Sequence, residues 1–568
     1  MTANAFNPLI LVQAAAMQTP KEHTWLRFFI GLAVLINFSG LFVPLLDPDA
    51  GIYAMITKNM VLHNDYLNLQ FQDKDWLDKP HFPFWITAAF FKVFGINTWA
   101  YKLPGILFAL LGALYTYLFA KQQYNKTTAL WATLMLLCSL HFLASNNDVR
   151  AEPFLTGMII AAVYHFSNSF RSFFSWHLVA ACAFTAMAMM TKGPFTLVPI
   201  GGAVAGQLLF RQDWKQLFHL RWLLALILLV IFISPELYSL WYQFDQHPEK
   251  LVFGTTNVSG IRFFLWDSQF GRFFNSGPIK GKGDPFFFLH TLLWAFLPWA
   301  ILMYVALYKK IRSAFTASQR KAQEWYTLCG SIPALLMFSF SGFQLPYYTN
   351  ILFPFFAILT AAYIMELKEK DIRLTVLLQR LIIIIVLTGI TLLFVLYRPG
   401  ITSVFAFAVL CGLLLLLLLF PFIIKLPSLP SVLIRSALSV LIVGQFLSGV
   451  FYPDALQYQS GNHMAFYLNR NLPGLPAASG KLYIPVGQFY LDRYIRITPI
   501  DTICKKEFIR PSVVFISDKE LEQLKQTGSP YEIVKEFPEY HITMPDLKFI
   551  NHATRASTLK KQFLVKLL

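Results

Sequence analysis

The stretch Leu46-Asp47-Pro48-Asp49-Ala50-Gly51-Ile52-Tyr53-Ala54 places two carboxylates directly after the first apolar segment of the chain, residues 26–46. A carboxylate that faces lipid costs a few kcal/mol, so carboxylates at a membrane boundary usually face water or a polar cavity. One interpretation is a helix terminus, at which Asp47 or Asp49 caps the next helix. The other is a polar site at the membrane surface.

The composition indicates a polytopic membrane protein. Of the 568 residues, 56% are hydrophobic and only 14% are charged, which excludes an ordinary soluble protein. The net charge of +17 would suit a nucleic-acid partner, but Lys and Arg collect in the cytoplasmic loops of membrane proteins, so none is expected. The five cysteines show no metal-ligand spacing, and four of them lie in apolar segments as small core residues.

About thirteen apolar segments have the length of a membrane span. They are residues 26–46, 101–120, 127–145, 153–169, 175–191, 194–210, 221–242, 286–308, 325–342, 348–366, 375–397, 401–424 and 432–452. Residues 1–20 are expected to form a loose amphipathic N-terminus, and Lys21 and Arg27 place it in the cytoplasm. Every second turn is then rich in Lys and Arg, whereas the short outer turns hold only Arg150, Lys192 and Arg398.

This topology puts every unusual polar cluster on the outer side of the membrane. Two loops there, residues 47–100 and 243–285, carry charged residues, and the first is expected to hold surface helices at 52–62 and 82–94. A secondary transporter would place ionisable groups near the midplane between repeated halves, and neither feature is found in the sequence. An enzyme acting on a lipid headgroup fits better, and a lipid or oligosaccharide transporter is the competing class.

The composition changes after residue 453. The sequence predicts a transmembrane domain over residues 1–453 and a small extracytoplasmic α/β domain over 454–568. In the second domain, residues 481–486 and 512–516 are predicted strands, and 518–526 is a predicted helix with Asp518 as its N-cap.

Several motifs, in order, resemble those of the GT-C membrane glycosyltransferases, in particular the bacterial lipid A aminoarabinose transferases and the protein O-mannosyltransferase-like proteins. Pro48–Ala54 resembles a Pro-Asp-Glu-x-Arg-Tyr-Ala motif, with Ala50 in place of Glu and Ile52 in place of Arg. The other matching segments are Asp78-Lys79-Pro80, Arg150-Ala151-Glu152-Pro153, Thr191-Lys192-Gly193-Pro194, Phe270-Gly271-Arg272-Phe273-Phe274, Gly283-Asp284-Pro285, Phe296-Leu297-Pro298-Trp299 and Leu345-Pro346-Tyr347-Tyr348, with Tyr347 in place of His.

The resemblance implies a GT-C-like polytopic α-helical fold and a multi-pass protein of the inner membrane. It implies transfer of a sugar from a polyprenyl-phosphate carrier, such as undecaprenyl phosphate, to lipid A or a related envelope acceptor at the outer (periplasmic) face. Transfer to a secreted protein is the alternative. The Asp of the first motif is the catalytic carboxylate of the family, so Asp49 is the candidate here.

The chemistry of the leaving group assigns the remaining candidates. A departing phosphate needs cations or a metal, and no compact run of carboxylates offers metal ligands, so metal-independent transfer without a cofactor is expected. Lys79, Lys192 and Arg272, with Tyr347 and Tyr348, are the donor-site candidates. The sugar or acceptor candidates are Tyr53, Asp78, Trp85, Asp148 and Glu152.

Each candidate also has a simpler interpretation. Single lysines near a membrane surface commonly snorkel, and interfacial aromatic residues commonly form a belt. Asp148 and Glu152 are four residues apart and would share one face of a helix, but Asp148 could instead pair with Arg150.

Overall fold

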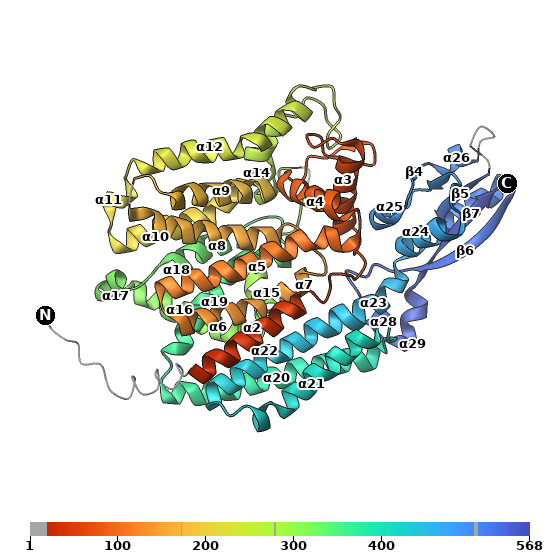
Figure 1. The fold of residues 1–568 in the computed structure, drawn as a ribbon. Helices are drawn as coiled ribbons and strands as arrows, with labels where there is room; N and C mark the ends of the chain where they lie inside the picture. The colour runs from red at the N-terminus through yellow and green to blue at the C-terminus, as the bar shows by residue number, and fades with distance from the viewer. Residues whose placement is uncertain (1–19, 172, 278–279, 505–508, 510) are drawn as a thin grey trace.

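The computed structural model describes residues 20–171, 173–277, 280–504, 509 and 511–568. Long helices run side by side and form a bundle, and a small sheet lies beyond one end of it (Figure 1). We call this the sheet end; α11 and α17 lie at the opposite end. The predicted loose N-terminus falls almost entirely on residues 1–19, outside the described residues.

The bundle is built of long helices and several shorter ones. Those of twelve or more residues are α2 (Pro20–Asn37), α5 (Thr98–Gln123), α6 (Lys126–Leu137), α8 (Glu152–Asn168), α9 (Trp176–Lys192), α10 (Leu197–Arg211), α12 (Arg221–Leu240), α16 (Ala300–Ala314), α18 (Tyr326–Ser339), α19 (Phe353–Met365), α20 (Glu369–Tyr397), α21 (Val404–Ile423) and α22 (Ser428–Phe446). Shorter helices are α7 (Leu140–Ser145), α11 (Trp214–Leu217), α14 (Ser268–Phe273), α15 (Phe287–Ala295) and α17 (Ala317–Ala322).

Among the described residues, six helical stretches are long and apolar enough to cross a membrane. They are Thr98–Gln123, Trp214–Asp245, Pro346–Met365, Glu369–Tyr397, Val404–Ile423 and Ser428–Tyr458. The chain is therefore a multi-pass membrane protein, and the count of thirteen spans stays a prediction. Two predicted spans are interrupted: residues 127–145 divide into α6 and α7, and residues 286–308 divide into α15 and α16.

The first outer loop forms two helices at the sheet end, α3 (Asp49–His63) and α4 (Phe82–Phe94), close to the predicted ranges 52–62 and 82–94. Pro83 lies in the first turn of α4, where its missing N–H leaves no hydrogen bond unmade. A hairpin of β1 (Gln70–Phe71) and β2 (Lys74–Asp75) lies between the two helices. The loop is thus ordered against the bundle.

Residues 454–568, which we call the C-terminal segment, contain a five-stranded sheet in the order β4-β3-β5-β7-β6. The strands are β3 (Ala477–Ser479), β4 (Arg496–Ile497), β5 (Ser512–Ser517), β6 (Tyr531–Glu539) and β7 (Lys560–Leu567), and the helices of six or more residues are α24 (Ser460–Asn471), α25 (Pro485–Tyr490) and α27 (Asp518–Gln526). The strand β3 runs parallel to β4 and β5, and β7 runs antiparallel to β5 and β6.

Two predictions in this segment are wrong in detail. Residues 481–486 are not a strand, because Pro485 begins the helix α25, and proline lacks the N–H that a strand ladder needs. Asp518 is the first residue of α27 and not its N-cap. Ser517 fills that place in a capping box with Glu520, in which both side chains bond backbone N–H groups.

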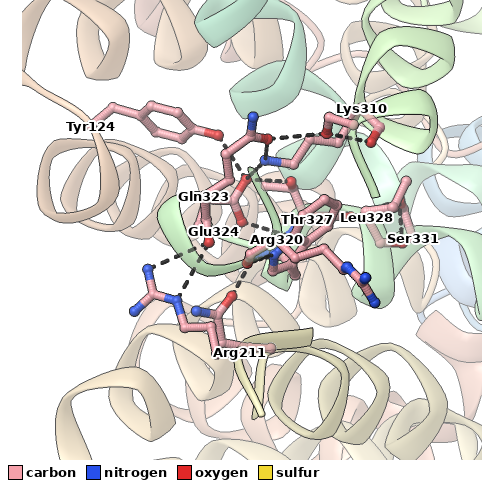
Figure 2. A network of polar contacts seen from close by, with 12 residues as sticks. Tyr124, Arg211, Lys310, Arg320, Gln323, Glu324, Thr327, Leu328 and Ser331 are labelled. Carbon is pink, nitrogen blue, oxygen red and sulfur yellow. Dashed lines mark hydrogen bonds and ion pairs between the residues drawn. The ribbon is translucent and has the colours of Figure 1, made fainter. Parts of the chain in front are cut away.

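A polar network joins three helices at the opposite end of the bundle (Figure 2). The Glu324 carboxylate accepts hydrogen bonds from the Tyr124 hydroxyl at 2.7 Å and the Thr327 hydroxyl at 2.6 Å, and the Lys310 ammonium lies 3.5 Å away. These groups follow α5, begin α18 and belong to α16, respectively. The buried carboxylate is therefore paired and ties these helix ends together.

Candidate active site

Most of the predicted site residues line one cavity of about 210 Å³ at the sheet end. Its walls are Asp49, Tyr53, Trp76, Asp78, Lys79, Arg150, Ala151, Glu152, Lys192, Arg272, Phe343, Leu345, Tyr347 and Tyr348. Asp148 and Trp85 are the predicted residues that do not line it. The loop 47–100, the segment before α8, the end of α9 and the segment after α18 thus meet here, although the sequence separates them widely.

Asp49 is the first residue of α3, and Pro48 occupies the N-cap position before it. Its carboxylate oxygen lies 2.6 Å from a guanidinium nitrogen of Arg150, and the side chain is 33% exposed to the cavity. Arg150 also binds Asp148 at 2.5 Å and lies 4.7 Å from the centre of the Tyr347 ring. The capping hypothesis is therefore wrong for Asp49, which is an oriented and accessible carboxylate.

Asp78 lies between two cations. The Lys79 ammonium is 2.5 Å from one carboxylate oxygen, and the Arg272 guanidinium pairs with the other. Burial would raise the pKa of Asp78, but Lys79 and Arg272 lower it below its ordinary value. Asp78 is therefore a fixed anion that holds two donor-site candidates at the cavity wall.

The loop that carries Lys79 is anchored by His81, which follows shortly after it in the sequence. His81 is completely buried, and its ring and its backbone N–H each lie 3.0 Å from one carboxylate oxygen of Glu236 in α12. The other ring nitrogen lies 3.0 Å from the carbonyl oxygen of Leu67. This buried pair attaches the loop that carries Asp78 and Lys79 to the bundle.

Lys192 ends α9 and forms an ion pair with Glu152, the first residue of α8; their side chains are 8% and 2% exposed. The Lys192 ammonium also lies 3.8 Å from the centre of the Tyr348 ring. The helix ends here because Gly193 has φ +107°, a conformation that other residues rarely adopt. Lys192 thereby points into the cavity and does not snorkel.

The predicted shared helical face of Asp148 and Glu152 is wrong. The helix α8 begins only at Glu152, so Asp148 lies in the preceding turn and pairs with Arg150, whereas Glu152 pairs with Lys192. The second interpretation of Asp148 is the correct one. Asp148 contacts the cavity only through Arg150.

Three of the four aromatic candidates line the cavity, and Trp85 does not. Tyr53 packs edge-on against Phe84 at 5.7 Å and lines the cavity, as do Tyr347 and Tyr348, which follow α18 in the 3₁₀ turn η5 (Pro346–Leu352). Trp85 points elsewhere: its indole N–H donates to the carbonyl oxygen of Tyr66 at 2.7 Å. Trp85 is thus placed as a support of the loop.

The site is balanced in formal charge, with four anions and four cations in contact: Asp49, Asp78, Asp148 and Glu152 against Lys79, Arg150, Lys192 and Arg272. No cluster of three or more His, Cys, Asp or Glu side chains able to hold a metal occurs within the described ranges. Each carboxylate at the site is bound by a Lys or Arg side chain.

An apolar groove of about 450 Å³ adjoins the polar cavity and shares Lys192, Arg272, Phe343 and Tyr348 with it. Its remaining walls are mostly apolar and come from the turn between α9 and α10, from α10, from α14 and the turn before it, from α18 and from η5, including Phe195, Val198, Leu265, Phe270, Phe273, Met337, Phe338 and Ile351. The two spaces together offer an apolar surface that ends at a cluster of cations.

Arg150 is the charged residue of the cavity that was not predicted as a site residue. The motif Arg150-Ala151-Glu152-Pro153 contained it, but the residue was assigned only as a possible partner of Asp148. The sequence held an indication that Arg150 belongs to the site, since an arginine beside two carboxylates in a short outer turn is unusual under the positive-inside bias.

The overall fold resembles that of a solved structure. The structure of ArnT from Cupriavidus metallidurans bound to undecaprenyl phosphate superposes with a TM-score of 0.73 at 19% identity, over 96% of this chain and 98% of that one. The fold is that of ArnT. The same protein in the apo state gives a TM-score of 0.72. The ArnT fold confirms the predicted GT-C-like architecture with a small sheet domain near the C-terminus.

Sequence relatives point the same way. The Dolichyl-phosphate-mannose-protein mannosyltransferase family matches residues 78–239. The undecaprenyl phosphate-alpha-4-amino-4-deoxy-L-arabinose arabinosyl transferases of Erwinia tasmaniensis and Pseudomonas paraeruginosa are 26% and 25% identical over 56% and 62% of this chain. The matched regions span 54% and 61% of those relatives' own lengths. The chain is thus similar in fold to ArnT and in sequence to these arabinosyl transferases.

Proposed function

We propose that the protein transfers a sugar from undecaprenyl phosphate, or a similar polyprenyl phosphate, to lipid A or a related envelope acceptor. The observation that carries the proposal is the junction of the two spaces, where an apolar groove meets Lys192 and Arg272 and a polar cavity holds Asp49. A polyprenyl chain fits the first space and its sugar phosphate the second. The names of the arabinosyl transferase relatives support this substrate class.

The charged residues would divide the chemistry. The bond between the sugar C1 and the phosphate oxygen breaks, and a new bond forms between C1 and the acceptor oxygen. Lys79, Lys192 and Arg272 stabilise the negative charge that develops on the departing phosphate. Asp49 takes the proton of an acceptor hydroxyl, or orients a phosphate acceptor, and Arg150 holds its carboxylate in place. The transfer needs no metal in this scheme.

The same proposal includes an orientation. The sheet end would face the periplasm, with the N-terminus in the cytoplasm and the protein in the inner membrane. The turns rich in Lys and Arg support it, because those around α11 and α17 gather at the opposite end of the bundle (Figure 1).

The acceptor has a second candidate. The match to the mannosyltransferase family favours transfer to a secreted protein, because members of that family act on proteins by their name. Mass spectrometry of envelope lipids and of secreted proteins, from cells with and without the gene, separates the two acceptors. A lipid-linked modification that depends on the gene supports the first, and a modified protein supports the second.

The decisive experiment uses purified protein in detergent with lipid-linked sugar donor. Sugar transfer that survives EDTA is the expected result. Transfer that EDTA abolishes would assign a metal to the leaving group. Movement of the lipid across sealed liposomes without any transfer would make the protein a transporter.

A further inference from the structure

The backbone immediately before the candidate catalytic carboxylate is held by the C-terminal segment. The backbone N–H of Leu45 donates to the Tyr490 hydroxyl at 3.0 Å, and its carbonyl accepts from the Gln459 amide at 3.0 Å. The N–H of Asp47 donates to the Gln459 side-chain oxygen at 3.0 Å. Three backbone groups within four residues of Asp49 are thus bound by residues more than 400 positions later in the chain.

The side chain of Asp47 adds a further bond to the same partner. Its carboxylate accepts from the backbone N–H of Val486 in the first turn of α25, at 2.9 Å. The first turn of a helix has N–H groups without partners inside the helix, so a carboxylate satisfies one of them well. Asp47 therefore caps α25 in the C-terminal segment, and not α3, which follows it in sequence.

A second attachment joins α3 to the C-terminal end of α25. Lys58 donates to the carbonyl oxygens of Phe489 at 2.8 Å and Leu491 at 2.6 Å, and lies 3.4 Å from that of Gln488. These are C-terminal carbonyls of α25, which favour a cation. The pKa of Lys58 is lowered to about 8 by burial.

The contact between the two helices is close. A Cβ atom at Gly51 would lie 2.6 Å from the backbone nitrogen of Val486, so only glycine fits there. On its other side α25 meets α24, where a Cβ at Gly487 would lie 2.9 Å from the carbonyl oxygen of Gly461. A chain of rigid contacts thus runs from α24 through α25 to α3, and α3 begins with Asp49.

We propose that Gln459 and Lys58 are positioning residues, through which the C-terminal segment holds α3 and fixes Asp49 in the cavity. The inference rests on the proposed function, since it gives the C-terminal segment a role in the same reaction. Neither residue lines the cavity. Their effect should therefore appear in turnover and not in donor binding.

The test compares Gln459→Met and Lys58→Met in the purified full-length protein. Each should lower kcat by about tenfold or more, because small misplacement of a catalytic group is costly, while the KM for the donor changes by less than about threefold. Lys58→Arg, which can still donate to the same carbonyls, should have a kcat close to that of the wild type. Hydrogen exchange of residues 45–54 should rise in both Met variants.

The control is Tyr494→Phe, which removes the hydrogen bond between Tyr494 and Asp73 in the same interface but touches neither α3 nor residues 45–47. It should keep wild-type kcat. Wild-type kcat in both Met variants, or an equal loss in Tyr494→Phe, would overturn the proposal. If the wild type transfers no sugar, the proposed function fails. Hydrogen exchange then tests the positioning role separately, because unchanged exchange of residues 45–54 in both Met variants would overturn it.

Discussion

At the scale of the residue, each charged side chain in the cavity has a partner of opposite charge before any substrate arrives. Asp49 is the most accessible of the carboxylates at the site, at 33% exposure against 20% or less for the others. The position of the carboxylate could be predicted from sequence because Pro48-Asp49 follows an apolar span. Its pairing with Arg150 could not, because 101 residues separate the two, and they meet through the packing of α3 on α4, α4 on α5 and α5 on α8.

Asp49→Asn should keep the size of the side chain and remove the charge. We expect turnover to fall by about 100-fold or more, as for a positioned acid or base, with undecaprenyl phosphate binding retained. Sugar transfer and donor binding by the purified variant check this. The control Asp267→Asn changes a carboxylate that is 41% exposed and outside the cavity, and it should behave as wild type. Near-normal transfer by Asp49→Asn would remove it from the chemistry.

Lys79→Ala should weaken undecaprenyl phosphate binding about tenfold or more, because a charge-assisted hydrogen bond contributes about 1.5–3 kcal/mol. Its effect on stability should be small, since Arg272 still compensates Asp78. Binding by the purified variant, measured with and without EDTA, checks this. Wild-type affinity would show that the ammonium does not reach the phosphate.

Lys192→Met should instead destabilise the protein, because it leaves Glu152 buried and unpaired, which costs about 3–5 kcal/mol. The double variant Lys192→Met/Glu152→Gln removes the stranded charge and should recover much of the thermal midpoint. The midpoint in detergent reports both. Equal midpoints for Lys192→Met and Lys79→Ala would contradict the buried ion pair.

At the scale of the element, apolar periodicity predicted where helices occur but not where they break. Residues 127–145 contain no Asp, Glu, Lys or Arg, yet α6 ends at Leu137 and α7 begins at Leu140, where the Leu140 N–H bonds the carbonyl of Leu297. Such a break depends on a partner about 160 residues away, which local sequence does not report. The strand predicted at 481–486 failed for a local reason, the proline at 485.

The contact between α3 and α25 should depend on pH. Removal from water raises the pKa of Asp47 to about 7, against the lowering effect of the Val486 N–H, and Glu539 raises it further. Between pH 3.8 and about pH 7, Asp47 therefore binds a proton more tightly in the folded protein than in the unfolded chain. This proton binding stabilises the folded state at low pH, and the stabilisation is lost as the pH rises through that range.

The thermal midpoint of the wild type should accordingly fall as the pH rises from about 5 to about 7, and that of Asp47→Asn should fall less. Asp267→Asn removes an exposed carboxylate, and its midpoint should change with pH as that of the wild type does. A midpoint that rises equally in all three proteins over this range would contradict the assignment of the proton to Asp47.

At the scale of the whole molecule, the charge of the turns predicts the orientation. Lys525→Cys in the C-terminal segment should react with a membrane-impermeant maleimide in spheroplasts, whereas Lys215→Cys in α11 should react only after permeabilisation; both lysines are exposed. The wild type corrects for labelling of its own cysteines. The reverse pattern would invert the topology and place the cavity on the cytoplasmic side.

The two hydrogen bonds between the Gln459 side chain and the backbone at Leu45 and Asp47 also set an order in time. They join residues 414 and 412 positions apart, so Gln459 is synthesised long after Leu45, Asp47 and α3. At about 5–20 residues per second, the interval is on the order of a minute. A nascent chain would therefore carry an unanchored α3 until the C-terminal segment had been synthesised and had folded against it.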